Sequence, residues 1–267
     1  MAKSKLIKDI VSEQISLTQA LDRLIVIAME IDDSNLLTWA KKEKNGYSKE
    51  DDIPEYRNIS LRPIGTYQLV GYGYIQTYKN QTLATIGVDD ELRKSINSHY
   101  ETSSIPTIEA NIAEIEKGSI IGVPIPPEMF YMFEEGTNIQ LISAVLAVDK
   151  NSLSKIIDCT KTKLIEILTL LEKNFGSLDS FDIDARDYDT IEMSTLKDAL
   201  SNIIQDKPNS NIYIISNSKV KNSNIGENTT SKTKEVEISP SVSIQKGESS
   251  KENIFTKIFK FLLRKGN

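Results

Sequence analysis

The chain has 267 residues, of which 39% are hydrophobic, enough apolar material for one substantial core or two small ones. Its formal net charge of −6 argues against a protein that coats nucleic acid, because phosphate binding needs clustered positive charge. The single cysteine, Cys159, excludes an internal disulfide and an all-cysteine metal cage.

The first 47 residues predict three short helices, because apolar side chains recur there at helical spacing. Polar residues stand where helix caps are expected. Ser16 precedes the second helix, and Asp33 or Ser34 precedes the third. Gly46 stands where the third helix should end.

A loop over residues 48–57 separates these helices from a segment of period two. The alternation from Tyr67 to Tyr78 predicts one strand with an aromatic face. Its two glycines, Gly71 and Gly73, indicate a bulge or a close backbone approach. Helices are predicted near residues 89–99 and 106–117, and a short one after Pro127.

The clearest element is a long amphipathic helix that begins near Leu153 and closes at Gly176. Before it, residues 139–148 form either a buried strand or the start of a helix, and a further helix is expected around 192–204. The predicted fold class is therefore α+β and predominantly helical, with an N-terminal three-helix segment, a small β element and the long helix.

Residues 1–206 are expected to form the body, 207–252 a polar and mostly disordered tether, and 253–267 a basic amphipathic helix. No acidic residue follows Glu252, so the −6 of the whole chain leaves about −10 for residues 1–252 and +4 for the tail. The residues expected to dock this helix on a membrane or a partner are Ile254, Phe255, Lys257, Ile258, Phe259, Lys260, Leu262, Leu263, Arg264 and Lys265.

Few residues suit catalysis. The lone histidine, His99, is expected near a helix end and Cys159 at the edge of a packed helical stripe, so a Cys–His pair is the less favoured reading. The run from Asp179 to Asp189 resembles the start of a calcium loop but lacks its glycine and its twelfth-position glutamate, which favours a solvated connector. The metal candidates within it are Asp182, Asp184 and Asp187. No cofactor is expected.

The densest polar and aromatic group lies at the end of the third helix and in the loop after it. Its members are Trp39, Glu43, Tyr47, Glu55, Tyr56 and Arg57. Either it binds a ligand or partner, or a buried arginine–carboxylate pair clamps the loop onto the helices. The second interpretation is favoured.

These residues carry a family resemblance. Trp39, Glu43, Gly46 and Tyr47 form a W-x-x-x-E-x-x-G-Y block, followed by a P-x-Y-R block at Pro54, Tyr56 and Arg57. With the end of the long helix, this order resembles the AbiTii domain of bacterial abortive-infection proteins over residues 4–176. In the helix block Thr160 and Lys161 stand where Val and Arg are usual, whereas Lys163, Leu171 and Glu172 match.

The resemblance implies a role in phage defence as the toxic or growth-arresting component, and carries over no catalytic residue. The favoured hypothesis is a non-enzymatic effector or interaction module in the cytosol, using the tail at the inner membrane surface or on a protein partner. Self-association is the other expected contact, and nucleic acid is not an expected partner of the acidic body. The alternative is a small toxin-like enzyme acting on nucleic acid or a nucleotide through the Trp39–Arg57 cluster or the acidic run.

Overall fold

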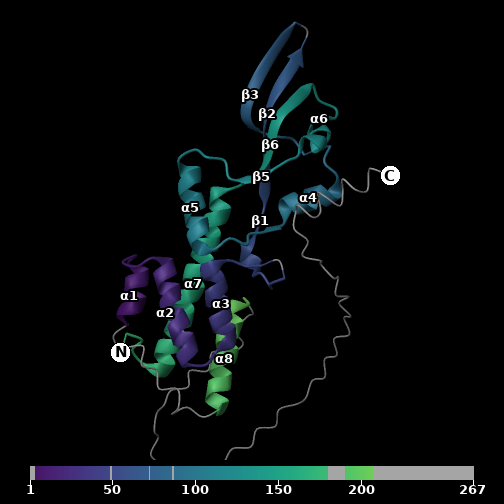
Figure 1. Cartoon of the computed structure of the whole chain (residues 1–267). Coiled ribbons are helices and arrows are strands. Elements are labelled where there is room, and N and C mark those ends of the chain that lie inside the picture. Colours follow the sequence, from purple (N-terminus) through teal and green to yellow (C-terminus); the bar gives the residue numbers. More distant parts are fainter. Residues whose placement is uncertain (1–3, 49, 72, 86, 180–189, 207–267) are drawn as a thin grey trace, which may run out of the picture.

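The computed structural model describes residues 4–48, 50–71, 73–85, 87–179 and 190–206. It confirms an α+β, predominantly helical fold, with a helical bundle at one end and a small sheet projecting from the other (Figure 1). The predicted tether and basic tail lie outside the described residues. Within the described part of the chain, no helix is both long and apolar enough to cross a membrane.

The bundle begins with the three predicted helices, α1 (Lys5–Val11), α2 (Leu17–Glu30) and α3 (Ser34–Asn45). Ser16 caps α2 in a reciprocal capping box with Gln19. Asp33 caps α3, its carboxylate accepting hydrogen bonds at 3.0 Å from two backbone amides of the first turn. Ser16 is the cap predicted from the sequence, and of the two candidates for α3 it is Asp33 that caps the helix, with Ser34 as its first residue.

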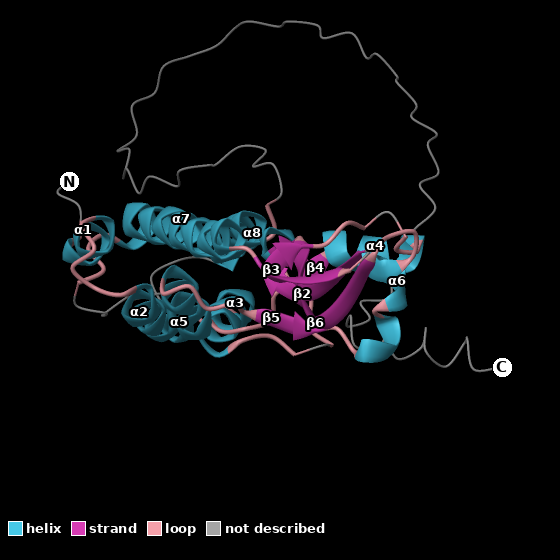
Figure 2. Ribbon diagram, turned by 90° about the horizontal axis from the view of Figure 1, so that it is seen from above, coloured by secondary structure: helices cyan, strands magenta, loops and turns pink. Residues whose placement is uncertain are grey.

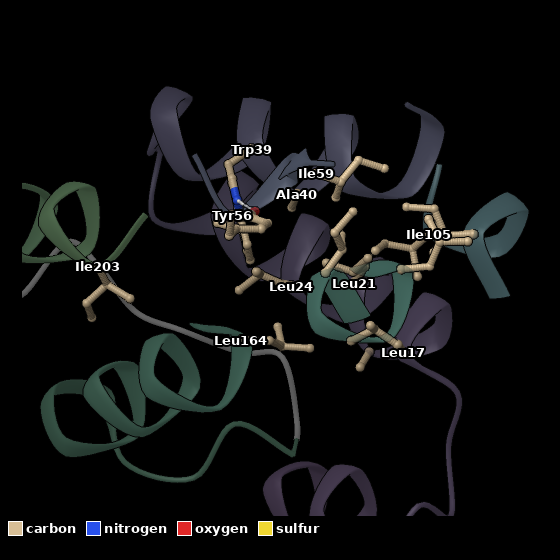
Figure 3. Close-up of a cluster of buried hydrophobic side chains, with 14 of the residues drawn as sticks. Leu17, Leu21, Leu24, Trp39, Ala40, Tyr56, Ile59, Ile105, Leu164 and Ile203 are labelled. Atoms are coloured by element: carbon tan, nitrogen blue, oxygen red, sulfur yellow. Dashed lines mark hydrogen bonds between the residues drawn. The ribbon is translucent and has the colours of Figure 1, made fainter. Parts of the chain in front are cut away.

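Helices from later in the chain complete the bundle: α5 (Ile105–Glu116), α7 (Lys150–Phe175) and α8 (Thr190–Ile204). Helix α7 packs against α1, α2, α5 and α8 and runs along the length of the bundle (Figure 1). Seen from above, it lies in one layer with α8, opposite a layer of α2, α3 and α5 (Figure 2). Figure 3 shows Leu21 and Leu24 of α2 facing Leu164 of α7 in the core. All three side chains are fully buried, which removes their apolar surface from water and stabilises the fold.

The sheet has the strand order β3-β2-β6-β5, with every neighbouring pair antiparallel. Its strands are β2 (Leu61–Gly71), β3 (Tyr74–Thr82), β5 (Gly122–Pro124) and β6 (Ile139–Val148). Residues 139–148 are therefore a strand, one of the two alternatives that the sequence left open. A second, two-stranded sheet pairs β1 (Asn58–Ile59) with β4 (His99–Tyr100).

The single strand predicted from Tyr67 to Tyr78 is wrong: the chain reverses at Gly71–Gly73 and forms the β2–β3 hairpin. Gly73 has a φ of +83°, which suits a tight turn. One continuous strand would have placed Tyr67 and Tyr78 on opposite faces, whereas in the hairpin they are directly paired and their rings stack at 5.4 Å. The only bulge of β2 against β3 lies elsewhere, between Gly65 and Tyr67.

Short elements connect the bundle and the sheet: the 3-10 turns η1 (Glu55–Arg57) and η2 (Pro127–Met129), and helices α4 (Asp90–Asn97) and α6 (Tyr131–Glu134).

His99 follows α4 but belongs to strand β4, where it pairs with Ile59, so its predicted helical position is wrong. Partial burial lowers the pKa of His99, while Glu101 opposes that shift. Cys159 lies partly buried on α7, as the packed stripe predicts.

The N-terminus of α1 is held by a residue in the last turn of α7 and by one that follows this helix. The Asp179 carboxylate accepts hydrogen bonds from the amides of Lys5 at 3.1 Å and Leu6 at 3.2 Å. The Glu172 carboxylate accepts from both the amide and the hydroxyl of Ser4. Asp179 thus supplies the cap that the side chain of Ser4 does not, which joins α1 to the segment that follows α7.

Candidate functional site

Helix α3 places the first residues of the polar and aromatic group. Trp39 and Glu43 lie one turn apart on the buried face of the helix. Gly46 then ends the helix with a φ of +96°, and a Cβ at this position would come within 2.9 Å of the Thr102 carbonyl oxygen. This conformation and close approach require glycine. The reversal brings the Tyr47 hydroxyl back to the Glu43 carboxylate, 2.6 Å from Oε1.

A buried ion pair between Glu43 and Arg57 lies at the centre of the group. Nη2 of Arg57 is 2.7 Å from Oε2 of Glu43 and Nε is 3.2 Å from Oε1, and both side chains are 0% exposed. Nη1 donates to the carbonyl oxygens of Glu101 and Ser103 at 3.1 and 2.8 Å. Burial lowers the pKa of Arg57, but its hydrogen bond and charge interaction with Glu43 outweigh this and raise the pKa overall.

Two tyrosines and a tryptophan surround the pair. The Tyr56 hydroxyl donates to Oε1 of Glu43 at 2.6 Å and accepts from Nε1 of Trp39 at 3.0 Å, a bond visible in Figure 3. The Arg57 guanidinium lies 4.7 Å from the centre of the Tyr47 ring. Burial, followed by the negative charge of Glu43, raises the pKa of both tyrosines. Their hydroxyls therefore stay protonated and act as donors to the carboxylate.

Helix α7 supplies two further members that the cluster read from the sequence did not include. Thr160 is fully buried and its hydroxyl lies 3.2 Å from Oε2 of Glu43. Nζ of Lys163 lies 5.3 Å from the centre of the Tyr56 ring and donates to the Ile203 carbonyl oxygen at 2.6 Å and to Asp206. Both residues belong to the helix block of the family resemblance. Their place in that block is the sequence signal that could have assigned them to the cluster. The group thereby joins α3, η1, α7 and α8.

Of the six residues predicted for this group, Glu55 turns away. Its carboxylate accepts a hydrogen bond from the Tyr100 hydroxyl at the surface, and partial burial together with Glu55 raises the pKa of Tyr100 to about 12. The other five, Trp39, Glu43, Tyr47, Tyr56 and Arg57, meet as described. We call these five with Thr160 and Lys163 the Glu43 cluster. Its ion pair and hydrogen bonds are those expected of a buried arginine–carboxylate pair that clamps the loop onto the helices, the structural interpretation offered by the sequence.

The remaining site predictions fall elsewhere. Asp182, Asp184 and Asp187 lie outside the described residues, as do the ten residues of the basic tail. Asp179, the first residue of the acidic run, is described and caps α1. In the part of the chain with described coordinates, no three His, Cys, Asp or Glu side chains gather as a metal site would require.

The family model AbiTii matches residues 4–195. The chain belongs to the AbiTii family. Membership places it among abortive-infection proteins of anti-phage defence. No curated protein and no solved structure matches the chain. The three blocks that carry this AbiTii signature converge in space, because the Glu43 cluster takes side chains from each of them.

A cavity of about 570 Å³ lies on the solvent side of the Glu43 cluster, between α3, the loop before η1 and α8. Trp39 and Tyr47 form part of its wall, and so connect it to the cluster. Polar and charged groups complete the lining, among them Lys42, Asp52 and Gln205. Lys42 is already paired with Asp51 at 2.8 Å, and this pair lowers the pKa of Asp51.

Proposed function

We propose that this AbiTii-family chain is a non-enzymatic effector of anti-phage defence that acts by docking its basic C-terminal segment on an anionic membrane surface. The observation that carries the proposal is the burial of the Glu43 cluster. Glu43 and Arg57 are 0% exposed, and their polar atoms bond to one another and to their neighbours. Neither side chain therefore presents a surface to a substrate.

The energetics of the cluster favour a structural role. Removing one partner of a buried ion pair leaves the other charged and unpaired, at a cost of about 3–5 kcal/mol. The two oxygens of Glu43 are occupied by donors from Tyr47, Tyr56, Arg57 and Thr160. An acid–base catalyst needs a lone pair free to take a proton, and here those lone pairs hold the body together.

The sequence of the tail supports docking. Its four basic residues interleave with apolar ones in NIFTKIFKFLLRKGN, and no acid follows Glu252. Each basic residue near an anionic bilayer contributes about 1 kcal/mol of attraction, and the apolar residues add burial in the interface. Residues 1–252, with a formal charge of about −10, would be repelled by the same surface, so docking would fall to the tail.

Vesicle flotation tests this proposal. The full chain should float with vesicles that contain phosphatidylglycerol and should stay in solution with purely zwitterionic vesicles. A chain truncated after Ser250 should not float with either. Lys257→Glu with Lys260→Glu is expected to abolish flotation, whereas the matched Lys257→Arg with Lys260→Arg retains it because the charge is kept. Equal flotation of the full and truncated chains would contradict membrane docking and point to a protein surface as the target.

A phage-challenge assay connects docking with defence. We expect the chain truncated after Ser250 and the charge-reversed variant to lose protection while the arginine variant keeps it. If the truncated chain no longer floats but still protects cells, docking by the tail is not required for defence.

The cavity favours a second candidate, a small-ligand or nucleotide activity at the outer side of the Glu43 cluster. Thr38→Trp would fill the cavity from the exposed face of α3 without removing a cluster bond. Under this candidate the variant loses protection with its folding intact; under the docking proposal it stays protective. Thr38→Ser, which leaves the space open, is the matched control.

A further inference from the structure

The two edges of the four-stranded sheet differ in protection. The β5 edge has only three residues and includes Gly122 and Pro124. The β3 edge has nine residues, nearly all exposed, and no described strand lies beyond it. Figure 1 shows β3 at the outer side of the sheet, away from the helical bundle. A long free edge presents unpaired N–H and C=O groups, which recruit another strand unless charge, proline or a bulge blocks them.

The end of the hairpin has none of these blocking features. No charged residue occurs from Pro63 to Tyr78, and the bulge of the β2–β3 pair, where Lys79 and Asn80 of β3 lie opposite Thr66, begins only after Tyr78. Val70 and Ile75, which pair directly with each other, are 48% and 67% exposed. The only charge within β3 is Lys79. The segment Tyr74–Tyr78 is therefore a regular, uncharged and open edge.

The hairpin register determines which backbone groups point outward. Gly71 and Tyr74 are the pair that closes the two-residue turn, and hydrogen-bonded and non-hydrogen-bonded pairs alternate from there. Gln76 and Tyr78 therefore direct their backbone groups toward β2. Those of Ile75 and Thr77 point away from the sheet, into solvent.

We propose that β3 pairs antiparallel with β3 of a second copy of this chain, in a register centred on Thr77. Thr77 then faces its own counterpart, and the outward amide and carbonyl of each copy bond to the other. Ile75 lies opposite the partner's Lys79, so the two Lys79 side chains do not face each other. The two four-stranded sheets become one continuous sheet.

A second copy fits this edge better than the chain's own apolar segment at residues 212–216. That segment begins six residues after Asp206, and six extended residues span at most about 20 Å. Helix α8, from which it continues, packs on α3 and α7 in the helical bundle, away from the projecting hairpin (Figure 1). The self-complementary register also places no like charges opposite each other.

Sedimentation velocity over a range of protein concentrations tests the pairing with the full chain. We expect a concentration-dependent monomer–dimer equilibrium. Thr77→Pro should abolish dimerisation, because it removes an outward N–H that the hairpin does not use, a position where an edge strand tolerates proline. Thr77→Val keeps the amide and should keep the dimer. Circular dichroism checks that the proline variant is folded.

Two charge variants test the register and do not depend on proline. Ile75→Lys places a positive charge opposite the partner's Lys79 at two symmetric positions and should weaken dimerisation about tenfold. Ile75→Glu places opposite charges together and should preserve or strengthen it. A chain that is monomeric at every concentration overturns the proposal, and equal Kd values for the two variants overturn the register. If a chain ending at Asp206 loses the dimer, the contact belongs to the C-terminal segment instead.

Discussion

The carboxylate of Asp179 accepts a hydrogen bond from the amide of Leu6, 173 residues earlier in the chain. Helix α1 is therefore capped from outside its own segment. We expect Asp179→Ala to lower the free energy of unfolding by about 1 kcal/mol at neutral pH, measured by urea denaturation. Asp198→Ala, at an exposed position of α8, is the matched control and should change stability little.

The same cap gives a pH dependence. Burial is the largest single effect and opposes ionisation of Asp179, but the hydrogen bonds from the amides of Lys5 and Leu6, together with Ser177 and the charge of Lys8, outweigh it and lower the pKa below the ordinary 3.8. A carboxyl with a lowered pKa in the folded state stabilises above its unfolded pKa and loses this contribution as pH falls through the folded value. The stability difference between the wild type and Asp179→Ala should be constant near neutrality and shrink below about pH 4. A difference that grows in acid would contradict the cap.

Breaking the Glu43–Arg57 pair should be the most damaging single change in the body. Glu43→Gln or Arg57→Met leaves a buried charge without its partner, for which we expect a loss of about 3–5 kcal/mol. Glu116→Gln breaks the exposed pair with Lys150 and should cost no more than about 1 kcal/mol. Equal losses at the two sites, in the same denaturation experiment, would show that the buried pair does not hold the fold.

Thr160 permits a finer test, because its hydroxyl donates to Oε2 of Glu43 from the neighbouring helix α7. Thr160→Val keeps the shape and removes this donor, so we expect a loss of about 1–2 kcal/mol. Thr160→Ser keeps the hydroxyl and should recover the part due to the hydrogen bond. A serine variant as unstable as the valine variant would mean that the methyl packing, and not the bond, matters.

The buried tyrosines predict a loss of stability in alkali. The pKa values of Tyr47 and Tyr56 are raised in the folded state, first by burial and then by Glu43. Such groups stabilise below their unfolded pKa of about 10, and this stability is lost as pH rises toward the folded value. The decline above pH ~10 should be shallower in Tyr47→Phe by about 1.4 kcal/mol per pH unit. Tyr74→Phe, at an exposed hairpin position, should leave the slope unchanged.

The hairpin shows where sequence reasoning failed and why. Period-two alternation reports a strand but not where it reverses, because both arms of a hairpin alternate in the same way. Within one strand, the glycines at 71 and 73 indicate a bulge or a close backbone approach, although two strands joined by two residues suit a tight turn equally well. The stacking of Tyr67 on Tyr78 follows only from the reversal.

The sequence by itself determined the features that depend on neighbouring residues: the cap at Ser16, a cap for α3 at Asp33 or Ser34, the end of α3 at Gly46, the long helix α7 and the family signature. Each rests on contacts within a turn or two of helix, so local spacing suffices. Tertiary structure alone decided that Thr160 reaches Glu43 across 117 residues, that Glu55 turns to Tyr100, and that Asp179 caps α1. These contacts exist only once α7 has packed on α1 and α3 and β1 has paired with β4, because hydrogen bonds between distant segments depend on which faces of the elements meet.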